Sequence, residues 1–382
     1  MKRRRLREIA LASQTRLALV AAVWMSLFAY AGRPILAGAA AAGLAPGIGW
    51  AVLAAFAIVP ALPLVAGRRS AAHWSGYAIL ALFSTLLVLV IVGDVVRGAY
   101  TLARLVIPAW PLLDPRAVSV TILGTAGALT LIGVFQARCP RVRNVTVPIE
   151  NLPPELDGYR IVQWSDVHVS PTIRRAFVES LVERTNALEP DAVVITGDLV
   201  DGDADDLRDE VQPMRGLRPR DGVFYVTGNH EYYWQASEWI PLLQSLGLDF
   251  LKNEHRVLRG GQLVIAGVTD PVGRGTHTQD VDGAVFGAPA SAIKVLLSHR
   301  PQTAEAASRL GVDLQLSGHT HGGQFFPFNL FIHRFQPIAK GLHRVGRTWL
   351  YVNRGTGYWG PPTRLAVGGE ITVVELRHAD NC

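Results

Sequence analysis

Four long apolar stretches dominate the first third of the chain. They occupy residues 14–32, 47–66, 76–96 and 117–136. Each has close to the number of residues, about twenty, that an α-helix needs to cross a bilayer. The Ala/Gly-rich segment 35–46 can extend either of the first two stretches, whereas segment 101–113 is short and interrupted by proline, so we expect it to lie at the interface. The pattern predicts about four transmembrane helices.

From residue 144 the pattern changes to short β-rich runs that alternate with amphipathic segments. Such alternation predicts a layered α/β domain. The expected strands cover Arg160–Trp164, Ala192–Thr196, Val223–Thr227, Gln262–Val268, Ile293–Leu297 and Leu314–Leu316. We therefore expect a membrane domain over residues 1–143 and a soluble domain over residues 144–382.

Charge separates the same two parts. Residues 1–143 carry 15 Lys/Arg and 3 Asp/Glu, while residues 144–382 carry 22 Lys/Arg and 28 Asp/Glu. The net charge of +6 thus comes from the apolar part, where basic residues flank the expected spans. Because an acidic domain would be repelled by a phosphate backbone, the composition argues against nucleic-acid binding.

The distribution of basic residues around the spans predicts their orientation. Eleven lie in the N-terminal segment, in the second loop or after the fourth span: Lys2, Arg3, Arg4, Arg5, Arg7, Arg16, Arg68, Arg69, Arg138, Arg141 and Arg143. The other two loops carry four: Arg33, Arg97, Arg104 and Arg116. The positive-inside rule then predicts that both termini face the cytoplasm. We expect a multi-pass protein of the cell inner membrane or plasma membrane with a cytoplasmic soluble domain.

Metal-binding residue types follow directly after five of the expected strands. Residues i and i+2 of an extended chain project to the same side, so Asp166 and His168 can converge on one cation. Asp198 offers two carboxylate oxygens that can bridge two metal ions. The other strand-end residues of interest are Asn229, His230, Glu231, His299, His319 and His321. Two carboxylates, an amide and four imidazoles suit two divalent cations such as Mn²⁺, Fe²⁺ or Zn²⁺.

The order of these motifs resembles that of the calcineurin-like metallophosphoesterases. Asp-x-His, Gly-Asp, Gly-Asn-His-Glu, a single His and Gly-His-x-His follow one another within residues 145–378. The run from Gly318 to Gln324, with Asn353–Gly357, is similar to the YkuE-like branch, some members of which carry N-terminal membrane spans. The resemblance implies a four-layer α/β/β/α sandwich. It also implies one metal ion held by Asp166, His168, Asp198 and His321, and a second held by Asp198, Asn229, His299 and His319.

The resemblance further implies that His230 lies near the leaving group. We expect His230 to protonate or stabilise the departing oxygen, with Glu231 as its orienting partner. The candidates for holding phosphoryl oxygens are Arg300, Arg354 and Arg364, although each is as readily explained by an ordinary ion pair. The acidic cluster from Asp201 to Glu210 matches no calcium-binding loop, and we interpret it as a solvated helix start.

The short link between the last span and the soluble domain suggests the class of substrate. It keeps the site near the lipid headgroups. The apolar run Phe325–Ile332 either fills the core or forms an exposed lip that receives acyl chains. We expect a phosphodiester or pyrophosphate substrate, preferably lipid-linked and similar to UDP-diacylglucosamine, on which some membrane-linked members of the resembled family act. A phosphomonoesterase or protein phosphatase with soluble substrates, or a membrane sensor with secondary hydrolysis, stays an alternative, and no protein partner is indicated.

Overall fold

The computed structural model describes residues 2–64 and 70–381, with side chains at position 16 and over 18–63 and 71–381. The basic residues counted above at positions 2–7, 68 and 69 lie outside these described side chains. The chain forms two compact units, Met1–Ile132 and Gly133–Cys382. This division falls before residue 143 because the end of the last apolar helix packs within the second unit.

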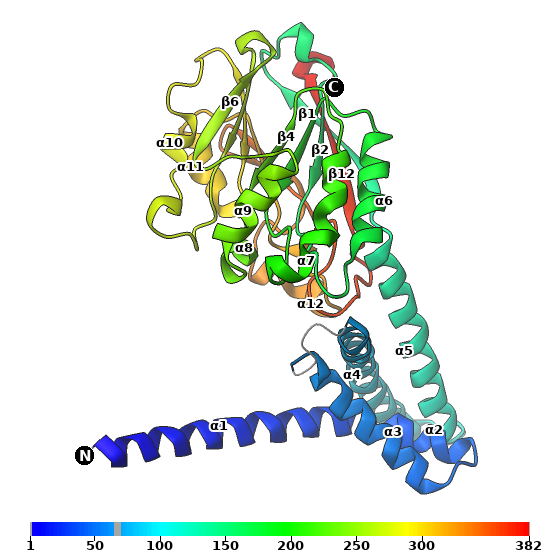
Figure 1. Cartoon of the computed structure of the whole chain (residues 1–382). Helices are drawn as coiled ribbons and strands as arrows, with labels where there is room; N and C mark the ends of the chain where they lie inside the picture. Colours follow the sequence, from blue (N-terminus) through cyan, green and yellow to red (C-terminus); the bar gives the residue numbers. More distant parts are fainter. Residues whose placement is uncertain (1, 65–69, 382) are drawn as a thin grey trace. The chain divides into compact units, whose positions relative to one another are not determined.

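The first unit consists of helices. The helices up to the start of the second unit are α1 Lys2–Ala31, α2 Arg33–Ala41, α3 Pro46–Ile58, the 3₁₀ helix η1 Val59–Leu64, α4 Ser70–Val106 and α5 Pro115–Arg138 (Figure 1). Within the described residues, four stretches are long and apolar enough to cross a membrane: Ala18–Ala41, Pro46–Pro63, Ala71–Val106 and Pro115–Arg138. The prediction of about four membrane helices is therefore confirmed. Residues 101–106 complete α4 and form no separate segment, because the first proline after Ser70 is Pro108.

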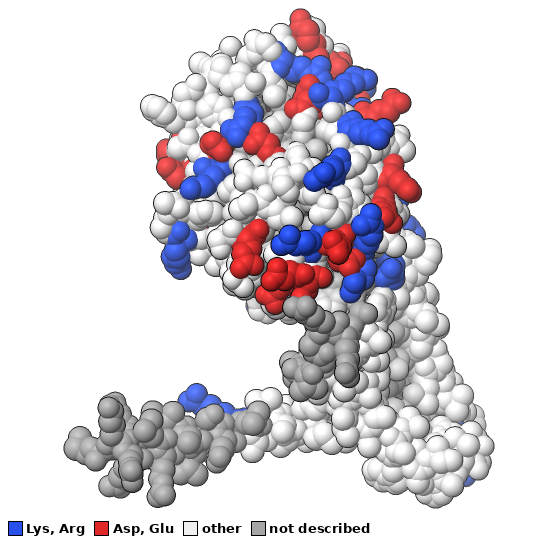
Figure 2. Space-filling model, viewed as in Figure 1, with Lys and Arg blue, Asp and Glu red and all other residues white. Residues whose placement is uncertain are grey.

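Aromatic packing and one ion pair characterise the first unit. Phe28 is buried, and its ring stacks on that of Phe83 with 4.0 Å between centroids. Arg33 pairs with Asp94 at 2.6 Å, and the Tyr30 hydroxyl donates to the same carboxylate at 2.8 Å. Asp94, an acid within an apolar helix, is thereby paired with a base. Figure 2 shows few Lys, Arg, Asp or Glu among the described residues of this unit, and many on the visible face of the second.

Two six-stranded sheets form the second unit. The strands of the first sheet are, in spatial order, β1 Arg141–Ile149, β12 Glu370–His378, β2 Arg160–Trp164, β3 Ala192–Thr196, β4 Val223–Val226 and β5 Leu248–Phe250. Those of the second sheet are β10 Gly341–Val345, β11 Thr348–Val352, β9 Leu314–Ser317, β8 Ile293–Leu297, β7 Leu263–Gly267 and β6 Glu254–Leu258. All six strands expected from the sequence form, and no end moves by more than one residue.

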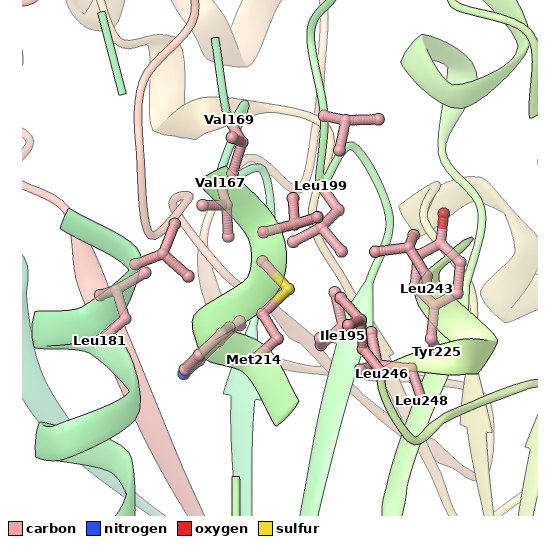
Figure 3. Close-up of a cluster of buried hydrophobic side chains, with 14 of the residues drawn as sticks. Val167, Val169, Leu181, Ile195, Leu199, Met214, Tyr225, Leu243, Leu246 and Leu248 are labelled. Carbon is pink, nitrogen blue, oxygen red and sulfur yellow. The ribbon is translucent and has the colours of Figure 1, made fainter. Parts of the chain in front are cut away.

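Burial alternates along the strands between separate cores. In β3, Ile195 packs in a core outside the first sheet, whereas Val194 packs in the core between the two sheets. Val264 of β7 belongs to a third core outside the second sheet. The outer cores are closed by α6 Arg175–Asn186, α7 Ala204–Val211, α8 Asn229–Tyr233 and α9 Ala236–Ser245 on the first sheet, and by α10 Val281–Val285 and α11 Ala304–Arg309 on the second (Figure 1). Figure 3 shows Leu181 of α6 and Leu243 of α9 in the first outer core. The four-layer α/β/β/α sandwich is confirmed.

The last turn of α5 is part of the second unit. Ala137 is fully buried in the first outer core, and the carbonyl of Gly133 accepts a hydrogen bond from the backbone N–H of Arg364 at 3.0 Å. A Cβ atom on Gly133 would overlap Oγ1 of Thr363, so the helix and this loop touch without space for a side chain. Strand β1 begins shortly afterwards and pairs in parallel with β12.

Candidate metal centre

The predicted ligands lie in loops that follow the carboxyl ends of five strands. In the first sheet β2, β3 and β4 are parallel neighbours, and in the second β8 and β9 are, so these loops collect at one end of the sandwich. Five of the predicted ligands have φ between 50° and 71°: Asp166, His168, Asp198, His319 and His321. Such conformations are strained for residues other than glycine and gather at functional sites. The backbone conformation therefore indicates a functional site in the same loops as the sequence motifs do.

Asp166, His168 and His321 form a first cluster. Oδ1 of Asp166 lies 3.2 Å from Nε2 of His321, and this nitrogen lies 3.1 Å from Nε2 of His168. Asp166 and His168 are fully buried. Asp166 and His168 are thus brought together with His321, which lies 153 residues after His168 in the sequence.

Asp198, His299 and His319 form a second cluster. Oδ2 of Asp198 lies 3.2 Å from Nε2 of His299, which lies 3.2 Å from Nδ1 of His319. The same carboxylate oxygen is 3.8 Å from Nε2 of His168 in the first cluster. The carboxylate of Asp198 therefore lies between the two clusters, within 4 Å of a histidine of each.

The donor atoms fit two divalent cations. The side-chain oxygen of Asn229, the remaining predicted ligand, is buried and accepts no hydrogen bond from the described residues. Leaving a buried acceptor without a donor is costly, and a cation would remove that cost. Each cluster also directs two imidazole nitrogens at each other within 3.2 Å. Imidazole, carboxylate and amide donors together suit Mn²⁺, Fe²⁺ or Zn²⁺.

Burial and neighbouring charges set the protonation of these groups. Burial lowers the pKa of His168 to about 3 and that of His319 to about 4, so both rings are neutral near pH 7. Burial alone would raise the pKa of Asp198, but the charge of His299 holds it well below its usual value. Against burial, Asp198 raises the pKa of His299 to about 10. A metal ion must displace this proton, because an imidazole ligand is neutral.

Two glycines allow the ligand loops to approach closely. A Cβ atom on Gly228 would overlap the carboxylate of Asp198, and one on Gly318 would overlap Oδ2 of Asp166. The carboxylate of Asp166 is also held by its neighbours, since Ser165 donates to Oδ2 at 2.5 Å. These contacts orient the carboxylates before any cation binds.

His230 pairs with Asp201, which corrects the expected pairing with Glu231. Nδ1 of His230 lies 2.9 Å from Oδ1 of Asp201, and the indole N–H of Trp234 donates to the same oxygen at 2.7 Å. Glu231 instead accepts hydrogen bonds from the backbone N–H groups of Asp198, Leu199 and Gly228, at 3.1, 2.6 and 2.7 Å. Consecutive residues of a helix point about 100° apart, so on α8 the side chain of Glu231 is directed away from that of His230.

The interpretation of the acidic cluster from Asp201 to Glu210 as a solvated helix start is wrong for its first and last residues. Asp201 lies in the loop before α7 and contacts His230, which helps to keep the pKa of Asp201 below its usual value against the effect of burial. Glu210, at the other end, is buried and pairs with Arg174 at 2.5 Å. Exposed members between them form the expected solvated helix start. Sequence reasoning missed Asp201, although its separation from the helix by Gly202 is visible in the chain.

The three candidate arginines have different surroundings. Arg300 pairs at 2.8 Å with Asp270, which is buried. Arg364 is fully buried, and its Nη2 lies 3.1 Å from Nδ1 of His321. Arg354 lines a separate cavity that none of the predicted metal ligands lines. Arg364 therefore supports a ligand loop, while Arg354 is turned to another site.

An aromatic ring lies between His230 and the apolar run Phe325–Ile332, which follows His321 in the sequence. The ring of Trp359 lies 6.2 Å from that of His230, and Phe325 lies 6.4 Å from Trp359. The short helix α12, Phe328–Phe331, then exposes most of its apolar side chains. The largest exposed residues form what we call the apolar rim: Phe328, Leu330, Phe331, Phe335 and Trp359. Within the run, Ile332 is buried, Phe328, Leu330 and Phe331 are exposed, and the other four residues are half-buried.

Comparisons with known proteins agree on one family. Residues 159–323 match the family model described as calcineurin-like phosphoesterase. A "transmembrane protein with metallophosphoesterase domain" from Danio rerio is 39% identical over 259 residues, which is 64% of this chain and 59% of that protein. An uncharacterised metallophosphoesterase of Aquifex aeolicus is 32% identical over 247 residues, 63% of this chain and 93% of that protein. The uncharacterised metallophosphoesterase YkuE of Bacillus subtilis is 30% identical over 274 residues, which is 66% of this chain and 93% of that protein. The chain thus spans about three fifths of the length of the Danio rerio protein and nearly all of the two bacterial ones.

Proposed function

Because the chain belongs to the calcineurin-like metallophosphoesterase family, we propose that it is a membrane-bound hydrolase of phosphodiester or pyrophosphate bonds with a lipid-linked substrate. Two divalent ions, Mn²⁺, Fe²⁺ or Zn²⁺, are required. Asp166, His168, Asp198 and His321 would hold one, and Asp198, Asn229, His299 and His319 would hold the other. The two clusters on either side of the Asp198 carboxylate support this assignment.

The protein's own groups hold the proton and transfer it. When bound, two such ions lower the pKa of a water molecule and neutralise charge on the phosphoryl oxygens. The ring of His230 lies 4.6 Å from that of His168, beside the first cluster, and gives its proton to the departing oxygen. Asp201 holds the opposite ring nitrogen and stabilises the imidazolium. Glu231 holds the backbone on both sides of Asp198.

The apolar rim is the observation that supports a lipid-linked substrate. An exposed apolar group beside a polar site usually marks a binding contact. Trp359, a member of the rim, has its ring 6.2 Å from that of His230, the residue proposed to protonate the leaving group. A Cβ atom on Gly323 would lie 2.7 Å from Cα of Asn329, so α12 packs directly on the loop that carries His321. The rim is therefore held next to the metal centre, and it offers an apolar surface for a lipid chain.

The membrane segments support a substrate drawn from the same bilayer. Four candidate spans precede the hydrolase unit, and α5 ends at Arg138, shortly before β1 begins at Arg141. Such a short connection keeps the hydrolase near the headgroups. The distribution of basic residues favours the cytoplasmic face. A lipid diester or a pyrophosphate similar to UDP-diacylglucosamine meets these conditions.

A substitution in the apolar rim tests the substrate class. The full-length protein, reconstituted in vesicles with Mn²⁺, is assayed on UDP-diacylglucosamine and on the soluble diester bis(p-nitrophenyl) phosphate. The variant F328S/L330S/F331S leaves out Phe326 because that residue is half-buried. We expect kcat/KM for the lipid to fall about tenfold or more, because three apolar contacts are lost, while the soluble diester is hydrolysed at the parent rate.

The control is Phe286→Ser, since Phe286 is exposed but does not belong to the rim. It should change neither activity. Equal losses on both substrates in the triple variant, with an unchanged melting temperature, would contradict a lipid-binding rim. A parent protein that hydrolyses soluble phosphomonoesters and neither of the two test substrates would favour the phosphomonoesterase alternative.

A further inference from the structure

A second cavity, separate from the metal centre, lies at the end of α5. Its volume is about 380 Å³, and all of its lining residues belong to the second unit. The residues that matter for its chemistry are Phe135, Gln136, Arg141, Arg143, Arg354 and Glu370. None of the predicted metal ligands lines it.

Three arginines and one carboxylate line this cavity. Arg141 and Arg143 project from the same side of β1, as residues i and i+2 of a strand do. Oε2 of Glu370 lies 3.9 Å from Arg143 and 3.6 Å from Arg354, beyond hydrogen-bond distance in both cases. Across the part of the chain that the structure describes, Arg141 has no ion pair. The cavity therefore carries an excess of positive charge.

The existing acceptor cannot satisfy these donors. Oε1 of Glu370 already accepts hydrogen bonds from the Tyr351 hydroxyl at 2.7 Å and from the backbone N–H of Arg354 at 3.1 Å. The Nε–H of Arg354 is buried and has no acceptor among the described residues. Burial and the charges of Arg354 and Arg143 lower the pKa of Lys340, as expected where cations are crowded. Nη1 of Arg354 donates to the Val367 carbonyl at 3.3 Å, which leaves its Nε–H as a donor that a negatively charged acceptor would satisfy.

We propose that this cavity binds the phosphate group of an anionic phospholipid. Guanidinium groups match phosphate oxygens in geometry and charge. Phe135 and Gln136 lie in the last turn of the candidate span Pro115–Arg138, so the cavity lies at the end of a segment that has to leave the hydrocarbon core. The phosphate groups at that depth belong to lipids, and basic clusters beside a span attract anionic ones.

The same cavity is connected to the first metal cluster through one loop. The backbone carbonyl of Arg354 accepts a hydrogen bond from Arg364 at 2.6 Å, and Arg364 reaches His321 at 3.1 Å. A phosphate bound by Arg354 would hold the loop against which Arg364 rests. The proposal does not depend on a lipid-linked substrate, because none of the rim residues lines this cavity.

Binding of a short-chain lipid to the full-length protein in nanodiscs tests the proposal. Dihexanoyl phosphatidate is the probe, and dihexanoyl phosphatidylcholine and inorganic phosphate are titrated in parallel. The variant R141Q/R143Q is compared with R215Q/R218Q, which removes the same charge outside the cavity. Each basic residue near a lipid surface contributes about fivefold in affinity, so we expect R141Q/R143Q to bind phosphatidate about 30-fold more weakly and the control to bind it like the parent.

Three results would overturn the proposal. Inorganic phosphate that binds as tightly as phosphatidate, with the same loss in R141Q/R143Q, would make free phosphate the occupant. Equal weakening in both double variants would show general charge attraction, and phosphatidylcholine binding equal to that of phosphatidate would show that the headgroup charge is irrelevant. If removal of Arg143 beside Glu370 destabilises the domain, R141Q alone carries the test, with an expected loss of about fivefold.

Discussion

Asp201 holds Nδ1 of His230 at 2.9 Å, so Nε2 of the ring is the nitrogen left to face the substrate. The same oxygen of Asp201 accepts the indole N–H of Trp234, which fixes the carboxylate in turn. Asp201 is therefore a positioning residue for His230. Its contribution should appear in the rate of the chemical step and not in the binding of metal or substrate.

Asp201→Asn should lower kcat about 10²-fold and leave KM and metal content nearly unchanged, because an amide carries no negative charge to stabilise the imidazolium. His230→Ala should cause a loss of similar size. The two substitutions combined should be no worse than His230→Ala alone, as for residues that act as a unit. Steady-state kinetics on a soluble diester measures both parameters, with the exposed Asp205→Asn as the control. Losses that multiply in the double variant would contradict the pairing.

Asp198→Asn tests the bridging position. The substitution removes a negative charge that lies 3.2 Å from His299 and 3.8 Å from His168. We expect the purified protein to lose at least one equivalent of metal and nearly all hydrolysis, with the fold largely retained. Elemental analysis and circular dichroism measure the two properties, and Asp209→Asn serves as an exposed control. A fully metallated and active variant would refute the bridging role.

Glu231→Gln should act on stability and not through His230. Glu231 is fully buried and accepts three backbone N–H groups, and an amide would direct its own N–H at one of them. We expect the free energy of unfolding to fall by about 2–4 kcal/mol, since a buried donor loses its acceptor. Thermal unfolding measures this, and the exposed Glu238→Gln should have no effect. A variant with parental stability and a kcat as low as that of His230→Ala would contradict this structural role of Glu231.

The partner of His230 is a part of the site that the sequence did not predict, since the expected partner was Glu231 and the observed one is Asp201. The strands that precede Asp166 and Asp198 could be predicted, because each is a short run of mainly apolar residues that can be recognised without the rest of the chain. The partner of His230 depends instead on the direction in which side chains leave the short helix α8, which no periodicity records. The second unit likewise begins at Gly133, which lies against Thr363, far along the chain. Local hydropathy contains no information about such a contact.

The orientation of the spans is open to a direct test with paired reporters. The asymmetry of eleven basic residues to four predicts that both termini face the cytoplasm. A cytoplasm-active reporter fused after Cys382 should be active and a periplasm-active one silent. Truncation and fusion after Leu112, between α4 and α5, removes the last span and should reverse both signals. This reversal is the internal control, because it shows that each reporter can respond in the membrane context of this chain. A periplasm-active signal after Cys382 with a cytoplasm-active signal after Leu112 would mean that the hydrolase faces the opposite side, and the proposed cytoplasmic substrate would have to be abandoned.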